Sequence, residues 1–113
     1  MYVWVTFQKE GFHCYPAAGT DERLKDVSFL QYKHRHIFHF RVDIEVFHNE
    51  RDIEIILFKR FCEDLLGDKI ELNNKSCETL ATEIAEQIRT KYPNRKLKIS
   101  VSEDNENGAC LEI

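Results

Sequence analysis

The feature that most constrains the fold of this chain is a long alternating segment, His34–Phe47. From Phe38 to Val46 every second residue is apolar, and the residues between them are polar or charged. Successive side chains of a β-strand point to opposite faces of a sheet, so this alternation predicts a strand with one apolar and one polar face. A sheet of such strands needs a layer of helices on only one side.

Three further segments are predicted to be strands, because they are rich in aromatic and β-branched residues or alternate in polarity. They are Tyr2–Gln8 with its continuation Phe12–Tyr15, Lys96–Ser102, and Ala109–Ile113. Gly11 is expected to place a bulge or kink within the first strand, and Asn107-Gly108 is expected to turn the chain into the last one. The polar stretch Pro16–Asp26 is predicted to be a loop, long enough to suggest a function.

Two segments have the spacing of amphipathic helices. In the second, Ser76 is a good N-cap, and apolar residues recur at helical spacing from Cys77 to Ile88. The first, Glu54–Leu66, is expected to end at Gly67, a residue suited to the left-handed conformation that closes many helices. The residues predicted to form its buried stripe are Ile56, Leu57, Phe61 and Leu65.

These elements predict one α+β domain, residues 1–113, with the order β-β-α-α-β-β. The expected architecture is a four-stranded antiparallel sheet with both helices packed on one face. The composition allows such a domain to close a core, since 42% of the residues are hydrophobic and 12% are aromatic.

Charge and cysteine content limit the partners and the cellular compartment expected for this protein. A net charge of −4 argues against a nucleic-acid partner bound through its phosphates. No apolar run reaches the ~18–20 residues of a membrane span, and no leader precedes the first strand, so no membrane partner is expected. The four cysteines, Cys14, Cys62, Cys77 and Cys110, form no C-x-x-C pair. We expect them to be reduced, which predicts a cytoplasmic protein.

Three histidines are candidate metal ligands. His34 and His36 form an H-x-H pair on the long strand, so both side chains point to the same face. His13 lies on the preceding strand, and a hairpin-like pairing of the two strands would bring it beside them. Three neutral imidazoles with one open position are the donor set of a catalytic zinc site. On the residues alone, ordinary polar histidines remain the simpler alternative.

Five short segments, spread in order over nearly the whole chain, share the pattern of one known family. They are G-F-H-C-Y-P at Gly11–Pro16, K-H-R-H-I-F at Lys33–Phe38, I-E-I-I-L-F-K at Ile53–Lys59, S-C-E-T-L-A at Ser76–Ala81 and I-S-V-S-E-D at Ile99–Asp104. They resemble the superfamily of 6-pyruvoyl-tetrahydropterin synthase and 6-carboxytetrahydropterin synthase, whose tunnelling fold has the same order of elements.

The resemblance implies a zinc cofactor held by His13, His34 and His36. It implies that Glu103 and, secondarily, Ser76 bind the small-molecule substrate, a pterin or a related base. It also implies a homo-oligomer in which subunits join by their sheet edges and the sites lie at subunit interfaces. Without the resemblance, a solvated acidic turn explains Glu103 more simply, and a helix cap explains Ser76.

The sequence departs from the family at the positions of its catalytic cysteine and histidine. The catalytic cysteine expected four residues before the first histidine of the pair is Leu30, and Lys69 stands where a histidine is expected. Arg35 replaces the glycine between the two histidines. No catalytic residue is therefore assigned, although Cys14 could be a displaced thiol.

Two functions remain open on this reasoning. The first is a zinc-dependent enzyme, a synthase-like lyase acting on a pterin or a purine-derived small molecule. The alternative is a catalytically degenerate module that binds a nucleotide- or pterin-like molecule on the same fold. A structural protein with incidental histidines is the third and plainest reading.

Overall fold

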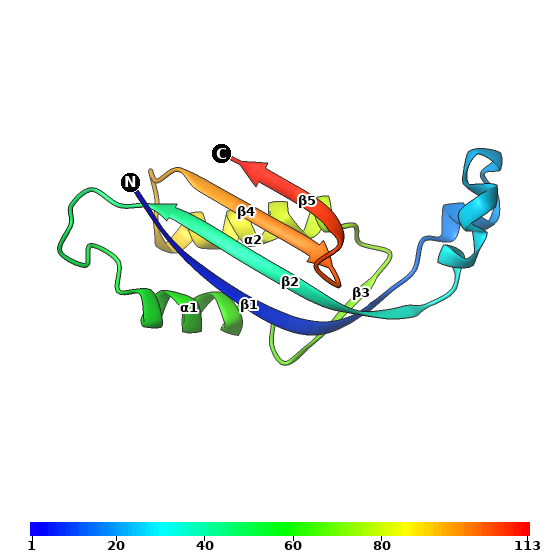
Figure 1. The fold of residues 1–113 in the computed structure, drawn as a ribbon, viewed down its shortest axis with the longest axis horizontal. Helices are drawn as coiled ribbons and strands as arrows, with labels where there is room; N and C mark the ends of the chain where they lie inside the picture. The colour runs from blue at the N-terminus through cyan, green and yellow to red at the C-terminus, as the bar shows by residue number, and fades with distance from the viewer.

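Five strands build the sheet of the computed structural model, which describes residues 1–113: β1 (Tyr2–His13), β2 (His34–Glu45), β3 (Lys69–Asn73), β4 (Leu97–Glu103) and β5 (Asn107–Glu112). Two α-helices, α1 (Ile55–Asp64) and α2 (Cys77–Lys91), and two 3-10 helices, η1 (Pro16–Gly19) and η2 (Glu22–Gln31), complete the chain. The strand order across the sheet is β3-β1-β2-β4-β5, and only the β3–β1 pair is parallel (Figure 1). The α+β class is confirmed, but the predicted four-stranded antiparallel sheet is wrong.

Strand β3 is the element that the sequence analysis missed. It has five residues, of which only Ile70 and Leu72 are buried. Two apolar positions are too few to establish a period of two, and so the segment carries no clear strand pattern. Its pairing with residues 10–13 of β1 makes the sheet mixed and leaves β3 and β5 as the two edges.

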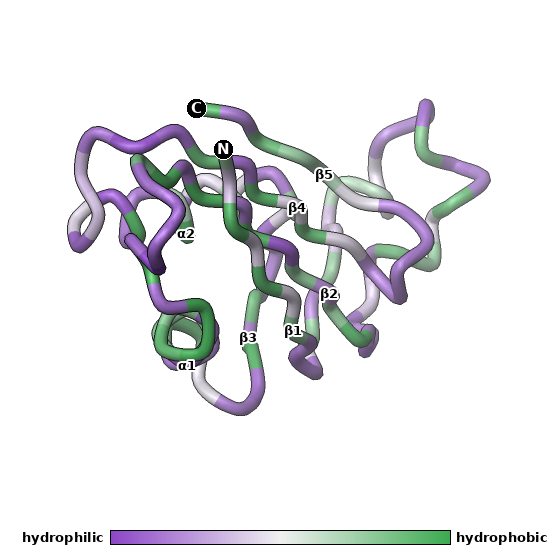
Figure 2. Tube along the Cα trace, turned by 60° about the vertical axis from the view of Figure 1, so that its left-hand side comes forward, coloured by the Kyte–Doolittle hydropathy of each residue, from purple (hydrophilic) through white to green (hydrophobic).

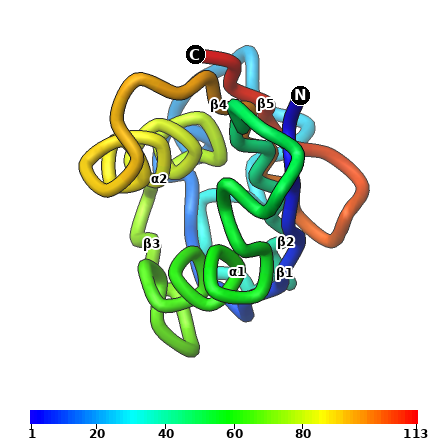
Figure 3. The backbone as a smooth tube through the Cα atoms, turned by 90° about the vertical axis from the view of Figure 1, so that its left-hand side faces the viewer, coloured from blue at the N-terminus to red at the C-terminus, as the bar shows by residue number.

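Helix α2 forms as predicted. The Ser76 hydroxyl accepts a hydrogen bond from the backbone N–H of Thr79, which caps the helix. The apolar residues at helical spacing are all buried: Cys77, Leu80, Ala81, Ile84, Ala85 and Ile88. The helix packs against β4 and β5, and α1 lies beside β1. Viewed end-on in Figure 3, both helices lie to the same side of β1 and β2.

The buried stripe predicted for α1 is wrong in two of its residues. Ile56 and Leu57 are 53% and 62% exposed, whereas Phe58 and Cys62 are fully buried. Four apolar residues, Ile55 to Phe58, follow one another at the start of this helix, and side chains at consecutive positions cannot all face the core. The observed orientation places Phe58 and Cys62, four residues apart, toward the sheet. The apolar residues Ile55, Ile56 and Leu57 therefore remain on the surface, and the hydrophobic colour of α1 can be followed in Figure 2.

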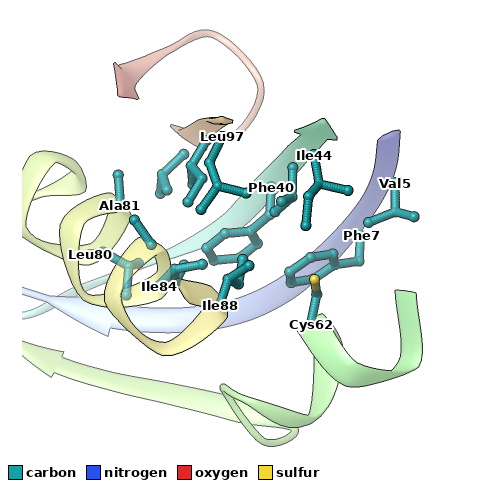
Figure 4. Close-up of a cluster of buried hydrophobic side chains, with 14 of the residues drawn as sticks. Val5, Phe7, Phe40, Ile44, Cys62, Leu80, Ala81, Ile84, Ile88 and Leu97 are labelled. Atoms are coloured by element: carbon teal, nitrogen blue, oxygen red, sulfur yellow. The ribbon is translucent and has the colours of Figure 1, made fainter. Parts of the chain in front are cut away.

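The core lies between the helices and one face of the sheet. On β2, Phe38, Phe40, Val42 and Ile44 are at most 2% exposed, so the apolar face predicted for this strand is confirmed. The rings of Phe7 and Phe40 stack with their centroids 4.9 Å apart. Figure 4 shows side chains from the sheet and from both helices pointing toward one another. Each buried side chain of this size contributes about 1.5–3 kcal/mol.

Gly11 does not interrupt β1, so the kink predicted there is wrong. The strand is continuous, and Gly11 pairs with His36 on β2. A Cβ atom at Gly11 would lie 2.6 Å from the Phe38 ring. The glycine is therefore required for the close approach of that ring, and the irregularity falls between Phe12 and His13 in the pairing with β3.

Residues 14–33 form an arm in place of the predicted loop. The arm contains η1 and η2 and extends from the end of the β1–β2 pair, as Figure 1 shows. It contributes to the elongated shape of the molecule, which measures 52 × 25 × 23 Å. The runs of polar residues that indicated a loop do not exclude short 3-10 helices, which need no apolar stripe.

The turn between β4 and β5 precedes the residues predicted for it. Asp104 and Asn105 have positive φ values of 53° and 58°, and Asn107-Gly108 already belong to β5. The predicted left-handed residue after α1 is confirmed, since Gly67 has a φ of 70°.

None of the helices combines the length and the apolarity that crossing a bilayer requires.

Candidate metal centre

The pairing of β1 with β2 brings the three predicted histidines together. His13 stands directly opposite His34 in the antiparallel register, and His36 follows two residues later on the same face. One nitrogen from each ring lies within 4.8 Å of the nitrogens of the other two. The ring centroids are 4.5 to 5.1 Å apart. This triad has the spacing needed to hold one metal ion.

Hydrogen bonds orient two of the imidazoles for metal binding. His34 Nδ1 lies 2.8 Å from the backbone oxygen of Tyr32, and His36 Nδ1 lies 2.6 Å from a carboxylate oxygen of Asp104. Carbonyl and carboxylate oxygens only accept, so Nδ1 carries the proton in the neutral form of each ring. The Nε2 lone pairs are then available to a cation, as in the carboxylate–histidine–metal arrangement of metalloproteins.

The inner nitrogens of the triad have unmet bonding capacity. His13 Nε2 and His36 Nε2 are buried and form no hydrogen bond. Buried polar atoms are nearly always satisfied, and a pair of orphaned nitrogens therefore needs an explanation. A metal ion bound between the rings would satisfy both. The residues present thus fit a cation.

The environment of His13 favours the neutral ring that a metal requires. His13 is 8% exposed and is the one buried polar side chain of the protein. Burial lowers its pKa below the ordinary 6.5, and the neighbouring His34 and His36 act in the same direction. Glu103 and a hydrogen bond to the backbone of Lys75 act in the opposite direction without reversing the shift.

Two adjacent carboxylates reach the triad from the β4–β5 turn. Glu103 places one oxygen 3.2 Å from His13 Nε2 and the other 3.6 Å from His36 Nε2. Asp104 accepts from His36 and, with its second oxygen, from the backbone N–H of Ile37 at 2.9 Å. These two hydrogen bonds hold the pKa of Asp104 below its ordinary value.

A pocket of about 470 Å³ opens beside the triad and is lined by His13, His34 and Glu103. Its other lining residues include Cys14, Leu30, Ser76 and Cys77. A larger hollow of about 680 Å³ lies around Thr6, His39 and Arg41 and contains none of the triad. The smaller pocket is therefore the one that metal chemistry could use.

The predicted substrate residues both line this pocket. The Ser76 hydroxyl is engaged in capping α2, since it accepts from Thr79 N at 3.1 Å. Leu30 lines the same pocket, whereas Lys69 is exposed on β3. Sequence reasoning missed Asp104, because its contact with His36 depends on the β4–β5 turn, which the sequence predicts at Asn107-Gly108.

The four cysteines are free, as expected from the sequence. Cys62 and Cys77 are buried, and burial raises the pKa of their thiols to about 12 and about 11. Cys14 is half-buried at the pocket wall. Of the two thiols that line the pocket, Cys77 is buried and Cys14 is the more accessible one.

Comparison with known protein families finds no matching family model, and comparison with curated proteins finds no significant relative.

Proposed function

We propose that the protein binds zinc through His13, His34 and His36 and acts on a pterin or purine-derived small molecule, as a synthase-like lyase of the pterin synthase type. The observation that carries the proposal is the triad itself, with buried, unbonded nitrogens beside a pocket. Three neutral imidazoles with an open position are the usual protein donors of catalytic zinc. The resemblance in sequence supplies the substrate class.

In this proposal the chain's own residues fix the ligands and shape the site. Bound zinc would polarise a substrate oxygen or lower the pKa of a bound water toward ~7. The Tyr32 carbonyl and the Asp104 carboxylate orient His34 and His36 through Nδ1. Glu103 and Ser76 are the proposed substrate-binding groups, a carboxylate being suited to paired N–H donors on the edge of a heterocycle.

A binding module without turnover is the second candidate, and one observation favours it. Leu30 lines the pocket at the position where the family carries a cysteine. An alkyl side chain can neither transfer a proton nor attack a substrate. Cys14 lines the same pocket, and it is the residue that the enzymatic proposal would need in that role.

A homo-oligomer with sites at subunit interfaces is the proposed assembly. Its support is the open sheet: β5 at one edge is largely exposed, and residues 2–9 of β1 lack a strand partner on their outer side. Natural proteins cover or pair such edges.

Zinc content tests the metal part of this proposal. We expect about one zinc ion per chain in freshly purified protein by native mass spectrometry, and loss of that zinc in the variant His34→Ala. His39→Ala is the matched control, since His39 lies on the same strand but faces the larger hollow. Equal zinc in both variants, or none in the wild-type protein, would contradict the proposal. Turnover of a dihydroneopterin triphosphate analogue then separates the enzyme from the binding module.

A further inference from the structure

We propose that Glu103 is the fourth ligand of the metal in the ligand-free protein, so that a small molecule reaches the metal only by displacing this carboxylate. The inference rests on the proposed metal binding by the triad. It concerns the fourth coordination position of the metal, which three histidine ligands leave open.

The first support is distance. Ligands bound tetrahedrally to zinc at ~2.0–2.1 Å lie about 3.3 Å from one another. Glu103 Oε1 is 3.2 Å from His13 Nε2, and Oε2 is 3.6 Å from His36 Nε2. The Glu103 carboxylate therefore lies at about ligand-to-ligand distance from two of the three histidines, His13 and His36.

The second support is that no hydrogen bond explains these close approaches. His13 Nε2 and His36 Nε2 form none, although Glu103 is so near. His36 Nδ1 is engaged with Asp104, so Nε2 is the nitrogen of this ring that faces Glu103. A cation between the two groups would satisfy both the unbonded nitrogen and the carboxylate.

The third support is the way in which the backbone holds Glu103. The residue ends β4 and is paired on both sides, with Phe38 of β2 and with Asn107 of β5. The next residue, Asp104, is tied to Ile37 by two hydrogen bonds, from its backbone N–H to the Ile37 oxygen at 2.7 Å and from the Ile37 N–H to its carboxylate at 2.9 Å. The turn therefore fixes both carboxylates, one orienting His36 and the other facing the ion.

The arrangement determines what kind of molecule can use the site. Three neutral imidazoles and one carboxylate leave a divalent ion with a charge of about +1 and no free position in a tetrahedral shell. A neutral oxygen donor competes poorly with a carboxylate for that position, whereas a molecule with two adjacent oxygen donors can replace it. The displaced Glu103 carboxylate then becomes free to accept N–H groups of the incoming ring, as proposed above.

Cobalt substitution of the full chain tests the inference without an activity assay. Co²⁺ in a four-coordinate site absorbs visible light strongly, and it absorbs more weakly when waters raise the coordination number. We expect Glu103→Gln to weaken the visible bands of the Co²⁺ protein and to lower zinc affinity at least about tenfold in chelator competition. Glu106→Gln, an exposed glutamate of the same turn, is the matched control and should leave both readings unchanged.

The outcomes distinguish this inference from the proposed function. If Glu103→Gln keeps the wild-type spectrum and affinity while His34→Ala loses the metal, Glu103 is not a ligand but the triad stands. If the wild-type protein takes up neither ion, the metal site itself fails, and this inference with it. If the variant does not fold by circular dichroism, X-ray absorption of the wild-type zinc protein decides. Three imidazoles and one oxygen at ~2.0–2.2 Å, with scattering from a carboxylate carbon behind that oxygen, support the inference, whereas a water oxygen without such a carbon or a five- or six-coordinate ion overturns it.

Discussion

Replacing Gly11 by alanine should destabilise the fold and loosen the candidate metal site together. The new Cβ would lie 2.6 and 2.7 Å from two carbons of the Phe38 ring, about 1 Å closer than carbon atoms pack at their optimum. Phe38 is completely buried, so the ring has no free space into which to move. Overpacking of this kind costs about 1–3 kcal/mol, from which the better strand propensity of alanine subtracts about 0.5–1 kcal/mol. We expect a net loss of about 1–2 kcal/mol in the free energy of unfolding.

Urea unfolding followed by circular dichroism measures this loss, and a double-mutant cycle isolates its cause. In the background Phe38→Leu, which removes the ring edge that the new methyl group meets, Gly11→Ala should cost less than about 0.5 kcal/mol. The Phe38 ring also packs edge-on against His13 and His36, at centroid distances of 5.3 and 5.9 Å. Zinc affinity should therefore fall in the single variant. Unchanged stability in Gly11→Ala, or an equal cost in both backgrounds, would refute the packing argument.

Three further predictions follow from the structure. The exposed Cys110 should react with a thiol reagent in the native protein, whereas Cys62 and Cys77, with pKa values of about 12 and about 11, should react only after unfolding. Arg95 holds the pKa of Asp52 at about 2, below the ordinary 3.8, so the stability from this pair is present above pH ~4 and is lost as the pH falls toward 2. Asp52→Asn should flatten the dependence of urea unfolding on pH in that window; a slope equal to that of the wild type would contradict the assignment. Light scattering should give a mass that is a multiple of 13.4 kDa if the sheet edges pair between subunits, and a monomer mass would rule out the homo-oligomer.

The elements that the sequence predicted well are those with a repeated pattern. Helix α2 shows its apolar spacing over three turns, and every residue of that pattern is buried. Helix α1 begins with four consecutive apolar residues, Ile55 to Phe58, so its sequence fits more than one orientation. Only tertiary packing selects the orientation that buries Phe58 and Cys62. Strand β3 alternates over only five residues, too few to predict a strand, and its pairing with β1 is what makes it one.

The same distinction separates the predictable part of the site from the rest. His34 and His36 share a face because of strand periodicity, which is a local property that the sequence displays. The approach of His13 needed one further assumption, that the two strands pair, and the register bears it out. The contacts of Glu103 and Asp104 could not be predicted, because they depend on a turn whose positive φ values at Asp104 and Asn105 shift it away from the Asn-Gly pair.

The triad continues the rows of core side chains on β1 and β2. His34 and His36 occupy the row of β2 side chains that continues into Phe38 and Phe40, and His13 occupies the matching row on β1. A slip of one residue in the β1–β2 register would turn one strand's core side chains outward and separate His13 from the other two rings. The register that packs the core is thus the register that assembles the ligands. A substitution that shifts this register should therefore disturb the core and the candidate metal centre together.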